Sequence, residues 1–183
     1  MKIALDPGHG GADRKNTGPT GYVEADGVLD IASHCRDELQ NAGFTVLMTR
    51  ESDRTLSIRE RARLINQAQA DVAVSIHTNG AADPRIRGVE VIHSIHGGPG
   101  ERLATILYNR LAHDLHLPQR RRFQRIGNQG RDYYGIIRKT SMPCVIVEVE
   151  FHTNPEAERL LQDPLFRRKA GIALAGGVAK YYG

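Results

Sequence analysis

The stretch "DVAVSIHTNG", residues 71 to 80, joins an apolar run directly to a histidine and an asparagine. Residues 71–77 have the length and apolar character of a buried strand, and Gly80 marks the turn that follows. A histidine at the end of one strand is more often a satisfied polar group than a ligand. Its meaning therefore depends on whether other strands of the chain end in the same way.

Short apolar runs alternate with segments of helical period along the whole chain. The strands are predicted at residues 2–6, 44–50, 71–77, 88–94 and 144–151, and the helices at 24–42, 58–68, 100–116, 155–162 and 165–181. Ser57 and Glu60 form a capping box at the start of the second helix. The basic, glycine-containing segment 117–135 is predicted to be a long surface loop. The alternation predicts one α/β domain over residues 1–183, with a mostly parallel twisted central sheet flanked by helices on both faces.

The composition is that of a soluble globular chain, with 40% hydrophobic and 25% charged residues among 183. No apolar run approaches the roughly 20 residues that a membrane span needs, and no signal peptide is visible at the start. Cys35 and Cys144 sit in apolar settings without the spacing of a metal knuckle or a disulfide framework, which predicts buried free thiols. We expect a monomer.

The chain is mildly basic, with a net charge of +4, and its densest basic stretch is "QRRRFQR" at residues 119–125. Such a stretch suits a polyanionic partner, either nucleic acid or an anionic polymer of the cell wall. The chain has no Trp and only four Phe, and the arginines do not alternate with aromatic residues, since Phe123 alone lies among them; this argues against a nucleic-acid-binding protein. The candidate contacts to an anionic substrate are Arg120, Arg121, Arg122 and Arg125, with a solvated face as the alternative reading.

Polar residues follow or interrupt several of the predicted strands. His9 follows the first strand in "IALDPGHGG", His77 ends the third, Glu148 lies in the last, and Glu24 opens the first helix. In open α/β sheets, functional groups collect beyond the carboxyl ends of the strands. Two histidines and a carboxylate from separate elements suit a catalytic zinc ion, and a further carboxylate can then act as the base. Taken singly, His9 also reads as a turn residue and Glu24 as a residue favoured by the helix dipole.

The whole chain, from Lys2 to about Tyr182, resembles the zinc-dependent N-acetylmuramoyl-L-alanine amidases of the amidase-3 family. The resemblance rests on the ordered set "IALDPGHGG", "VEAD", "LSIRERARLINQAQADVAVSIHTNG", "GVEVIHS" and "MPCVIVEVEFHTNP". It implies a single catalytic domain that holds one zinc ion through His9, Glu24 and His77. It also implies a catalytic glutamate in "VIVEVEF", where the spacing to Phe151 favours Glu148.

Several residues near these motifs keep two readings. Glu150 competes with Glu148 because the two share a face if the strand is regular. Asn79 either orients His77 or serves the turn before Gly80. Where the family commonly has an asparagine in the helix after Glu24, this chain has Val28, which leaves Asp26 as a candidate local partner. We interpret three further histidines as loop or surface residues: His93, His96 and His152.

The function implied by the resemblance is a peptidoglycan hydrolase. The chain would cleave the amide between the lactyl group of N-acetylmuramic acid and L-alanine with zinc-activated water, and Glu148 would accept and then return a proton. The alternative is an inactive wall-binding or regulatory domain of the same fold, against which the intact set of four residues argues. No separate wall-binding domain is visible. We expect synthesis in the cytoplasm and action on the wall after release, as for an endolysin, or a domain of a longer secreted protein.

Overall fold

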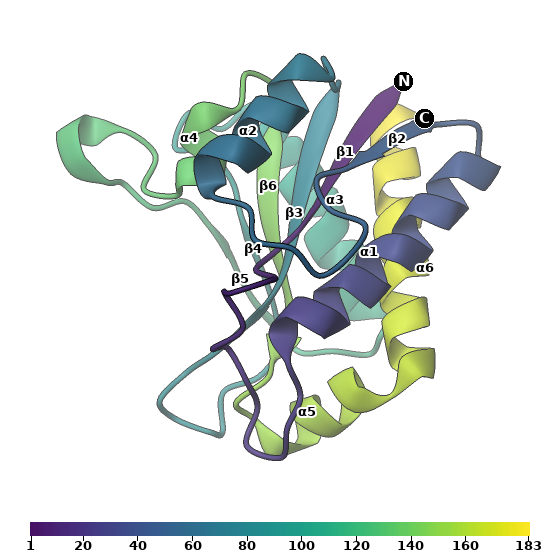
Figure 1. Cartoon of the computed structure of the whole chain (residues 1–183), viewed down its shortest axis with the longest axis vertical. Helices are drawn as coiled ribbons and strands as arrows, with labels where there is room; N and C mark the ends of the chain where they lie inside the picture. The colour runs from purple at the N-terminus through teal and green to yellow at the C-terminus, as the bar shows by residue number, and fades with distance from the viewer.

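A six-stranded sheet forms the centre of the computed structural model, which describes all 183 residues (Figure 1). The strands are β1 (Lys2–Pro7), β2 (Thr45–Met48), β3 (Val72–Asn79), β4 (Val89–Ile92), β5 (Gln119–Phe123) and β6 (Cys144–Phe151). The helices are α1 (Glu24–Asn41), α2 (Ile58–Gln67), α3 (Pro99–Asp114), α4 (Gly135–Lys139), α5 (Pro155–Gln162) and α6 (Pro164–Tyr182), with a 3-10 turn at Asn128–Gly130.

The sheet has the order β2-β1-β3-β6-β4-β5 and is mostly parallel, as the alternation of elements predicts. Strands β2, β1, β3 and β6 run in one direction. Strand β4 pairs antiparallel with β6, and β5 pairs parallel with β4. The carboxyl ends of β1, β3 and β6 therefore meet at one edge of the sheet, where the polar residues identified in the sequence follow.

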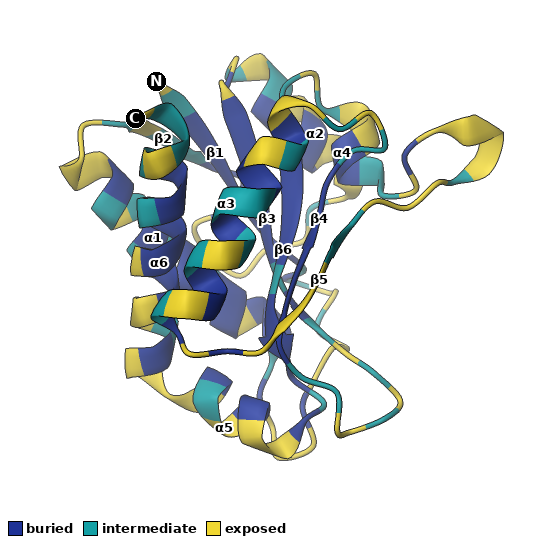
Figure 2. Cartoon of the chain, turned by 180° about the vertical axis from the view of Figure 1, so that it is seen from behind, coloured by how far each residue is buried: buried dark blue, intermediate teal, exposed yellow.

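Helices cover both faces of the sheet, and each face has its own apolar cluster (Figure 2). One face of β6 contributes Val145, Val147 and Val149 to the larger cluster, which α1, α3 and α6 complete. The other face contributes Cys144 and Ile146 to a smaller cluster with α2 and α4. This alternation follows from the two-residue period of a strand. It determines which side chains of β3 and β6 point to the face of the sheet that α2 and α4 cover.

The helix boundaries have local causes that the sequence shows. At the start of α2 the Ser57 side chain accepts from the Glu60 amide and the Glu60 side chain accepts from the Ser57 amide, which confirms the predicted capping box. Asn154 and Asp163 cap α5 and α6 in a similar way, each just before a proline at the first helical position. Both cysteines are buried and free, as predicted. None of the helices combines the length and the apolarity that crossing a membrane requires.

The prediction of a long surface loop over residues 117–135 is wrong. Residues 119–123 form the edge strand β5, and α4 begins at Gly135. The arginines of β5 extend toward buried or surface carboxylates, so the strand pairs with β4 without an apolar alternation of its own. Within residues 117–135, it is the segment between β5 and α4 that projects from the body of the molecule, and it is largely exposed (Figure 2).

The three histidines interpreted as loop or surface residues all lie outside the helices and strands, but only His96 is at the surface. His96 lies in an exposed turn. His93 and His152 follow strands β4 and β6, but both are buried. The His152 ring nitrogen Nδ1 lies 3.1 Å from the Thr78 hydroxyl, and His93 Nδ1 donates to the Ser94 carbonyl. These polar partners inside the fold offset the free-energy cost of removing the two rings from water.

Candidate metal centre and active site

A tight turn after β1 places His9 at the sheet edge. His9 and Gly10 both have positive φ, 56° and 115°, and a Cβ on Gly10 would lie 2.8 Å from the Arg54 carbonyl oxygen. Glycine is therefore required at position 10. The Arg61 guanidinium of α2 fixes the turn from below by donating to the carbonyls of Pro7 and His9.

Arg61 is itself held by a buried carboxylate at the end of β1. Asp6 accepts hydrogen bonds from Arg61, from the Thr49 hydroxyl at 2.6 Å and from the Ser75 hydroxyl at 2.7 Å. Burial opposes ionisation of Asp6, but the Arg61 charge and these bonds outweigh it and lower the pKa of the carboxyl. The turn that carries His9 is thus anchored to β3, to the residue that follows β2 and to α2.

His77 packs against the same turn from β3. A Cβ built on Gly8 would lie only 2.1 Å from His77 Cε1 and 2.5 Å from Nδ1, so the imidazole edge occupies the space that any other residue at position 8 would fill. The His9 and His77 rings are 5.0 Å apart in an edge-to-face arrangement. The missing side chain of Gly8 is what lets the two histidines approach.

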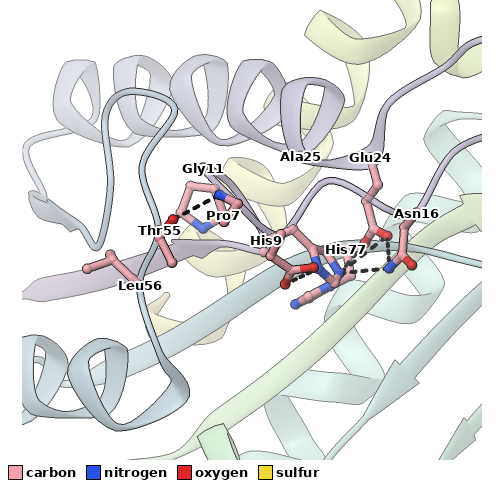
Figure 3. A network of polar contacts seen from close by, with 12 residues as sticks. Pro7, His9, Gly11, Asn16, Glu24, Ala25, Thr55, Leu56 and His77 are labelled. Atoms are coloured by element: carbon pink, nitrogen blue, oxygen red, sulfur yellow. Dashed lines mark hydrogen bonds and ion pairs between the residues drawn. The ribbon is translucent and has the colours of Figure 1, made fainter.

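The structure brings His9, Glu24 and His77 together, with one potential ligand atom of each within 4.8 Å of the others. Glu24 is almost fully buried at the start of α1. Its Oε1 lies 3.0 Å from His77 Nδ1, and its Oε2 lies 3.4 Å from His9 Nε2. Figure 3 shows the three side chains turned toward one another from separate elements. Two imidazoles and one carboxylate are a donor set that suits zinc.

Three further groups orient these side chains, and none of them follows from the sequence patterns. His9 Nδ1 donates to the Asp13 carboxylate at 2.8 Å, which leaves Nε2 facing Glu24. The Asn16 amide donates to Glu24 Oε2 at 2.9 Å and lies 3.1 Å from His9 Nε2 (Figure 3). The backbone amide of Thr78 donates to Glu24 Oε1. Such outer contacts fix the orientation of ligand side chains.

The charges at this cluster are strongly coupled. The hydrogen bond with Glu24 raises the pKa of His9 to about 9 despite burial. Burial alone would lower the pKa of His77, but its hydrogen bond with Glu24 and the Glu24 charge raise it instead. Burial would raise the pKa of Glu24, yet the two histidines hold it well below its usual range. The ionised Glu24 carboxylate is therefore stabilised by nearby positive charge. Protons on His9 and His77 can supply this charge, and so can a bound cation.

Glu148 of β6 stands beside His77, since the two residues are paired in register between β3 and β6. Its Oε2 atom is buried and has no hydrogen-bond partner. Burial, with the nearby charges of Glu24 and Glu90 against that of His77, raises the pKa of Glu148 to about 7. A carboxyl group with this pKa accepts and releases a proton near neutral pH.

Glu150, the competing carboxylate, is directed elsewhere by an irregularity in β6. His77 pairs with Glu148 but Asn79 pairs with Phe151, so β6 holds one extra residue between these pairs. Glu150 is fully buried and accepts from the backbone amides of Gly88 and Phe151. The premise of a regular strand, on which its shared face with Glu148 depends, is therefore wrong.

The structure also places Asn79 and Asp26 away from the two histidines. The Asn79 amide donates to Glu90 Oε2 at 3.0 Å and its carbonyl oxygen accepts from the Gly80 amide, so it serves the turn rather than orienting His77. The exposed Asp26 carboxylate pairs with Arg14 and has no hydrogen bond to a candidate metal ligand. Val28 of α1 is buried in the larger apolar cluster.

The four arginines of the basic stretch divide into three environments. Arg120 and Arg121 donate to Glu90, a fully buried residue of β4. Arg122 pairs with Glu101 of α3, and Arg125 stacks over the Tyr133 ring at 3.8 Å. Sequence reasoning missed Glu90, for which the only signal is a charged residue inside the apolar run "GVEVI".

Two small cavities meet at His77. One, of about 220 Å³, is lined by residues of the His9 turn and the start of α2, including His9, Asp13 and Ser57. The other, of about 160 Å³, is lined by Glu148, Tyr134 and Ile146 among others. Ile58 borders both cavities. A ligand that contacts His77 therefore has room on either side of it, with Glu148 on one side only.

The fold and the site define an α/β protein with a candidate metal centre, in which two histidines at the carboxyl ends of parallel strands meet a buried glutamate at the start of α1. Within that class, the chain belongs to the Amidase_3 family, described as N-acetylmuramoyl-L-alanine amidase, whose model matches residues 3–180. The match covers nearly the whole chain and includes all four residues identified from the strand ends.

Relatives of known name agree with this assignment. The chain is 30% identical over 218 residues to the N-acetylmuramoyl-L-alanine amidase AmiA of Escherichia coli K12, covering 98% of this chain and 75% of that protein. It is 29% identical over 196 residues to the germination-specific N-acetylmuramoyl-L-alanine amidase of Bacillus subtilis, covering 98% and 79%. Among solved structures, the amidase AmiC2 of Nostoc punctiforme superposes with a TM-score of 0.91 at 27% identity, covering 100% of this chain and 97% of that one.

Proposed function

We propose that the chain hydrolyses peptidoglycan at the amide between the lactyl group of N-acetylmuramic acid and the L-alanine of the peptide stem, with one zinc ion held by His9, Glu24 and His77. Membership of the Amidase_3 family and similarity to amidases of this name support the reaction. The observation that carries the mechanism is the buried, unpartnered Glu148 Oε2 next to His77 in register.

When bound, zinc polarises the scissile carbonyl and lowers the pKa of a water molecule to about 7. The Glu148 carboxylate accepts a proton from the attacking water and then delivers it to the leaving nitrogen of L-alanine. One group can serve both steps because its pKa lies near neutrality. The carboxylate lies beside Ile146 in an apolar strand, and the burial of this position holds its pKa in that range.

The other residues of the site hold the ligands in place. Asp13 fixes the His9 ring through Nδ1, and Asn16 and the Thr78 amide fix the two oxygens of Glu24. Gly8 leaves the space that the His77 ring fills. These contacts fix the orientation of the three ligand side chains toward one another.

The test compares Glu148→Gln with Glu150→Gln, two isosteric changes in the same strand. Because general acid–base catalysis contributes about 10²- to 10⁴-fold, we expect Glu148→Gln to lower turnover of peptidoglycan at least 100-fold while zinc binding persists. Glu150→Gln keeps an oxygen for the Gly88 and Phe151 amides and is expected to retain turnover within about threefold of wild type, an order-of-magnitude allowance for a change away from the reacting atoms. Near-normal turnover by Glu148→Gln would refute the proposed role. A wild-type chain that binds zinc but leaves peptidoglycan intact would instead favour an inactive wall-binding domain.

A further inference from the structure

Two adjacent arginines of β5 converge on one buried carboxylate. Val89 pairs with Gln119 but Glu90 pairs with Arg121, so Arg120 is an extra residue at a bulge in β5. Neighbouring residues of a regular strand point to opposite faces, and the bulge removes this constraint. As a result, Arg120 Nε and Arg121 Nε donate to the same Glu90 oxygen at 2.7 and 2.8 Å.

This cluster, composed of Glu90, Arg120 and Arg121, has an excess of positive charge. Glu90 is the only carboxylate paired with either guanidinium, and its second oxygen also accepts from Asn79. The Arg120 side chain is 36% exposed and that of Arg121 54%. Arg121 also donates through Nη2 to Glu90 Oε2 at 3.3 Å, which leaves its Nη1 and both terminal nitrogens of Arg120 without a protein partner. The guanidinium groups lie over the rings of Phe151 and Phe123, which restricts their movement. Two guanidinium groups that share one carboxylate leave a net charge of +1. Such an oriented cationic pair suits a carboxylate ligand.

The cluster lies in line with the candidate active site. His77 pairs with Glu148, Glu148 with Glu90, and Glu90 with Arg121, in register across β3, β6, β4 and β5. Residues paired in this way point to the same face of the sheet, and adjacent strands are about 4.8 Å apart. Because both guanidinium groups contact Glu90, they lie about one to two strand spacings from Glu148, roughly 5–10 Å.

We propose that Arg120 and Arg121 bind a carboxylate of the peptide stem, one residue beyond the scissile amide. This inference rests on the proposed function, in which Glu148 gives a proton to the leaving nitrogen. The peptide half of the substrate therefore lies on the Glu148 side of the ligands, where the arginine cluster is the next charged group. A carboxylate on the second stem residue is roughly 6–7 Å from the scissile nitrogen, given about 3.5 Å per extended residue. This distance matches the position of the cluster.

The test uses two N-acetylmuramoyl-L-alanyl peptides that differ only at the second residue, which carries either a free α-carboxylate or its amide. We expect the wild-type chain to cleave the free acid with a kcat/KM about 10-fold higher than that of the amide. This is the difference that one partly exposed, charge-assisted hydrogen bond contributes. In Arg121→Gln, and in Arg120→Gln, this preference falls toward 1. Arg122→Gln is the matched control, because it removes the same charge from the same strand, whereas the Arg122 side chain pairs with Glu101 of α3 and not with Glu90. We expect this variant to keep the preference.

Removal of both arginines at once would leave Glu90 buried and unpaired, which destabilises a fold. The variant Glu90→Gln/Arg120→Gln/Arg121→Gln avoids this and loses the preference as well. Equal rates for the two peptides in the wild-type chain, or an unchanged preference in both single variants, would overturn the proposal. Calorimetry of the free-acid and amidated peptides with the Glu148→Gln chain measures the same preference without turnover. If peptidoglycan is not cleaved at all, the proposed function fails, and this binding difference still decides whether the arginine site exists.

Discussion

Replacement of Gly8 by alanine tests how closely the ligand arrangement depends on a single missing methyl group. The new Cβ would lie 2.1 Å from His77 Cε1, whereas ordinary contact begins near 3.4 Å, so the ring must move by about 1.3 Å. Metal–ligand distances tolerate deviations of only about 0.2 Å. The Gly8 φ lies outside the left-handed region, so alanine strains the site by contact alone. We expect zinc affinity to fall at least about 100-fold, beyond the range for loss of an outer contact.

The assay is zinc competition against a chromophoric chelator, with circular dichroism to show that the variant is folded. Gly100→Ala provides the control: Gly100 is helical, and its added Cβ would meet only the Cys144 carbonyl oxygen, at 4.0 Å. That variant should bind zinc as the wild type does. A folded Gly8→Ala chain whose zinc affinity stays within about threefold of wild type would contradict this expectation. Such a small change is far below that for a lost ligand contact, so His77 would not be constrained as the structure indicates.

Other changes probe the supporting structure and the charges. Arg61→Met leaves the Asp6 carboxylate buried without its cation, so we expect a loss of about 3–5 kcal/mol and a Tm lower by roughly 10 °C; a shift below about 2 °C in thermal denaturation would contradict the buried pair. Burial raises the pKa of Glu148 from 4.5 to about 7, so its ionisation costs the metal-free chain stability as pH rises through that window. Glu148→Gln should therefore raise the Tm of metal-free protein at pH 8 but not at pH 4, and equal shifts at both pH values would exclude this linkage. Zinc at 100 times its Kd should raise the wild-type Tm by about 5–10 °C, since binding to the folded state alone adds about 2.7 kcal/mol; a metal-independent Tm would argue against the site.

The main strands and helices could be predicted from the sequence because their apolar periods are strong. The strand at residues 144–151 and the helix at 155–162 have the predicted bounds, and the capping box fixes the start of α2. In each of these cases the signal is local: an apolar run, a turn residue or a cap. Such features survive in a single sequence because they require no knowledge of distant partners.

Strand β5 could not be predicted for the opposite reason. Its residues "QRRRF" have no apolar alternation, and the partners that satisfy its arginines, Glu90 and Glu101, lie 21 or more residues earlier in the chain. The stability of this strand comes from long-range ion pairs and from hydrogen bonds to β4. Propensity is a weak guide where tertiary contacts decide the structure.

The candidate ligands could be predicted from the sequence because His9, Glu24 and His77 stand at element ends, where an α/β sheet collects functional groups, and because their motifs resemble those of the amidase-3 family. Their orienting groups could not. Asp13 and Asn16 reach the site only through a turn in which His9 and Gly10 take positive φ, and Glu150 leaves it only through a bulge in β6. Neither irregularity has a residue pattern that distinguishes it in one sequence.

Zinc-dependent amidase activity is tested by incubation of the purified chain with peptidoglycan, followed by quantification of newly freed L-alanine amino groups. The measurement is made with the chain as purified, with a chelator, and after zinc is restored. New L-alanine termini are expected, and they should disappear with chelator and return with zinc. Peptidoglycan that remains intact under all three conditions, or new termini that persist in chelator, would contradict this expectation.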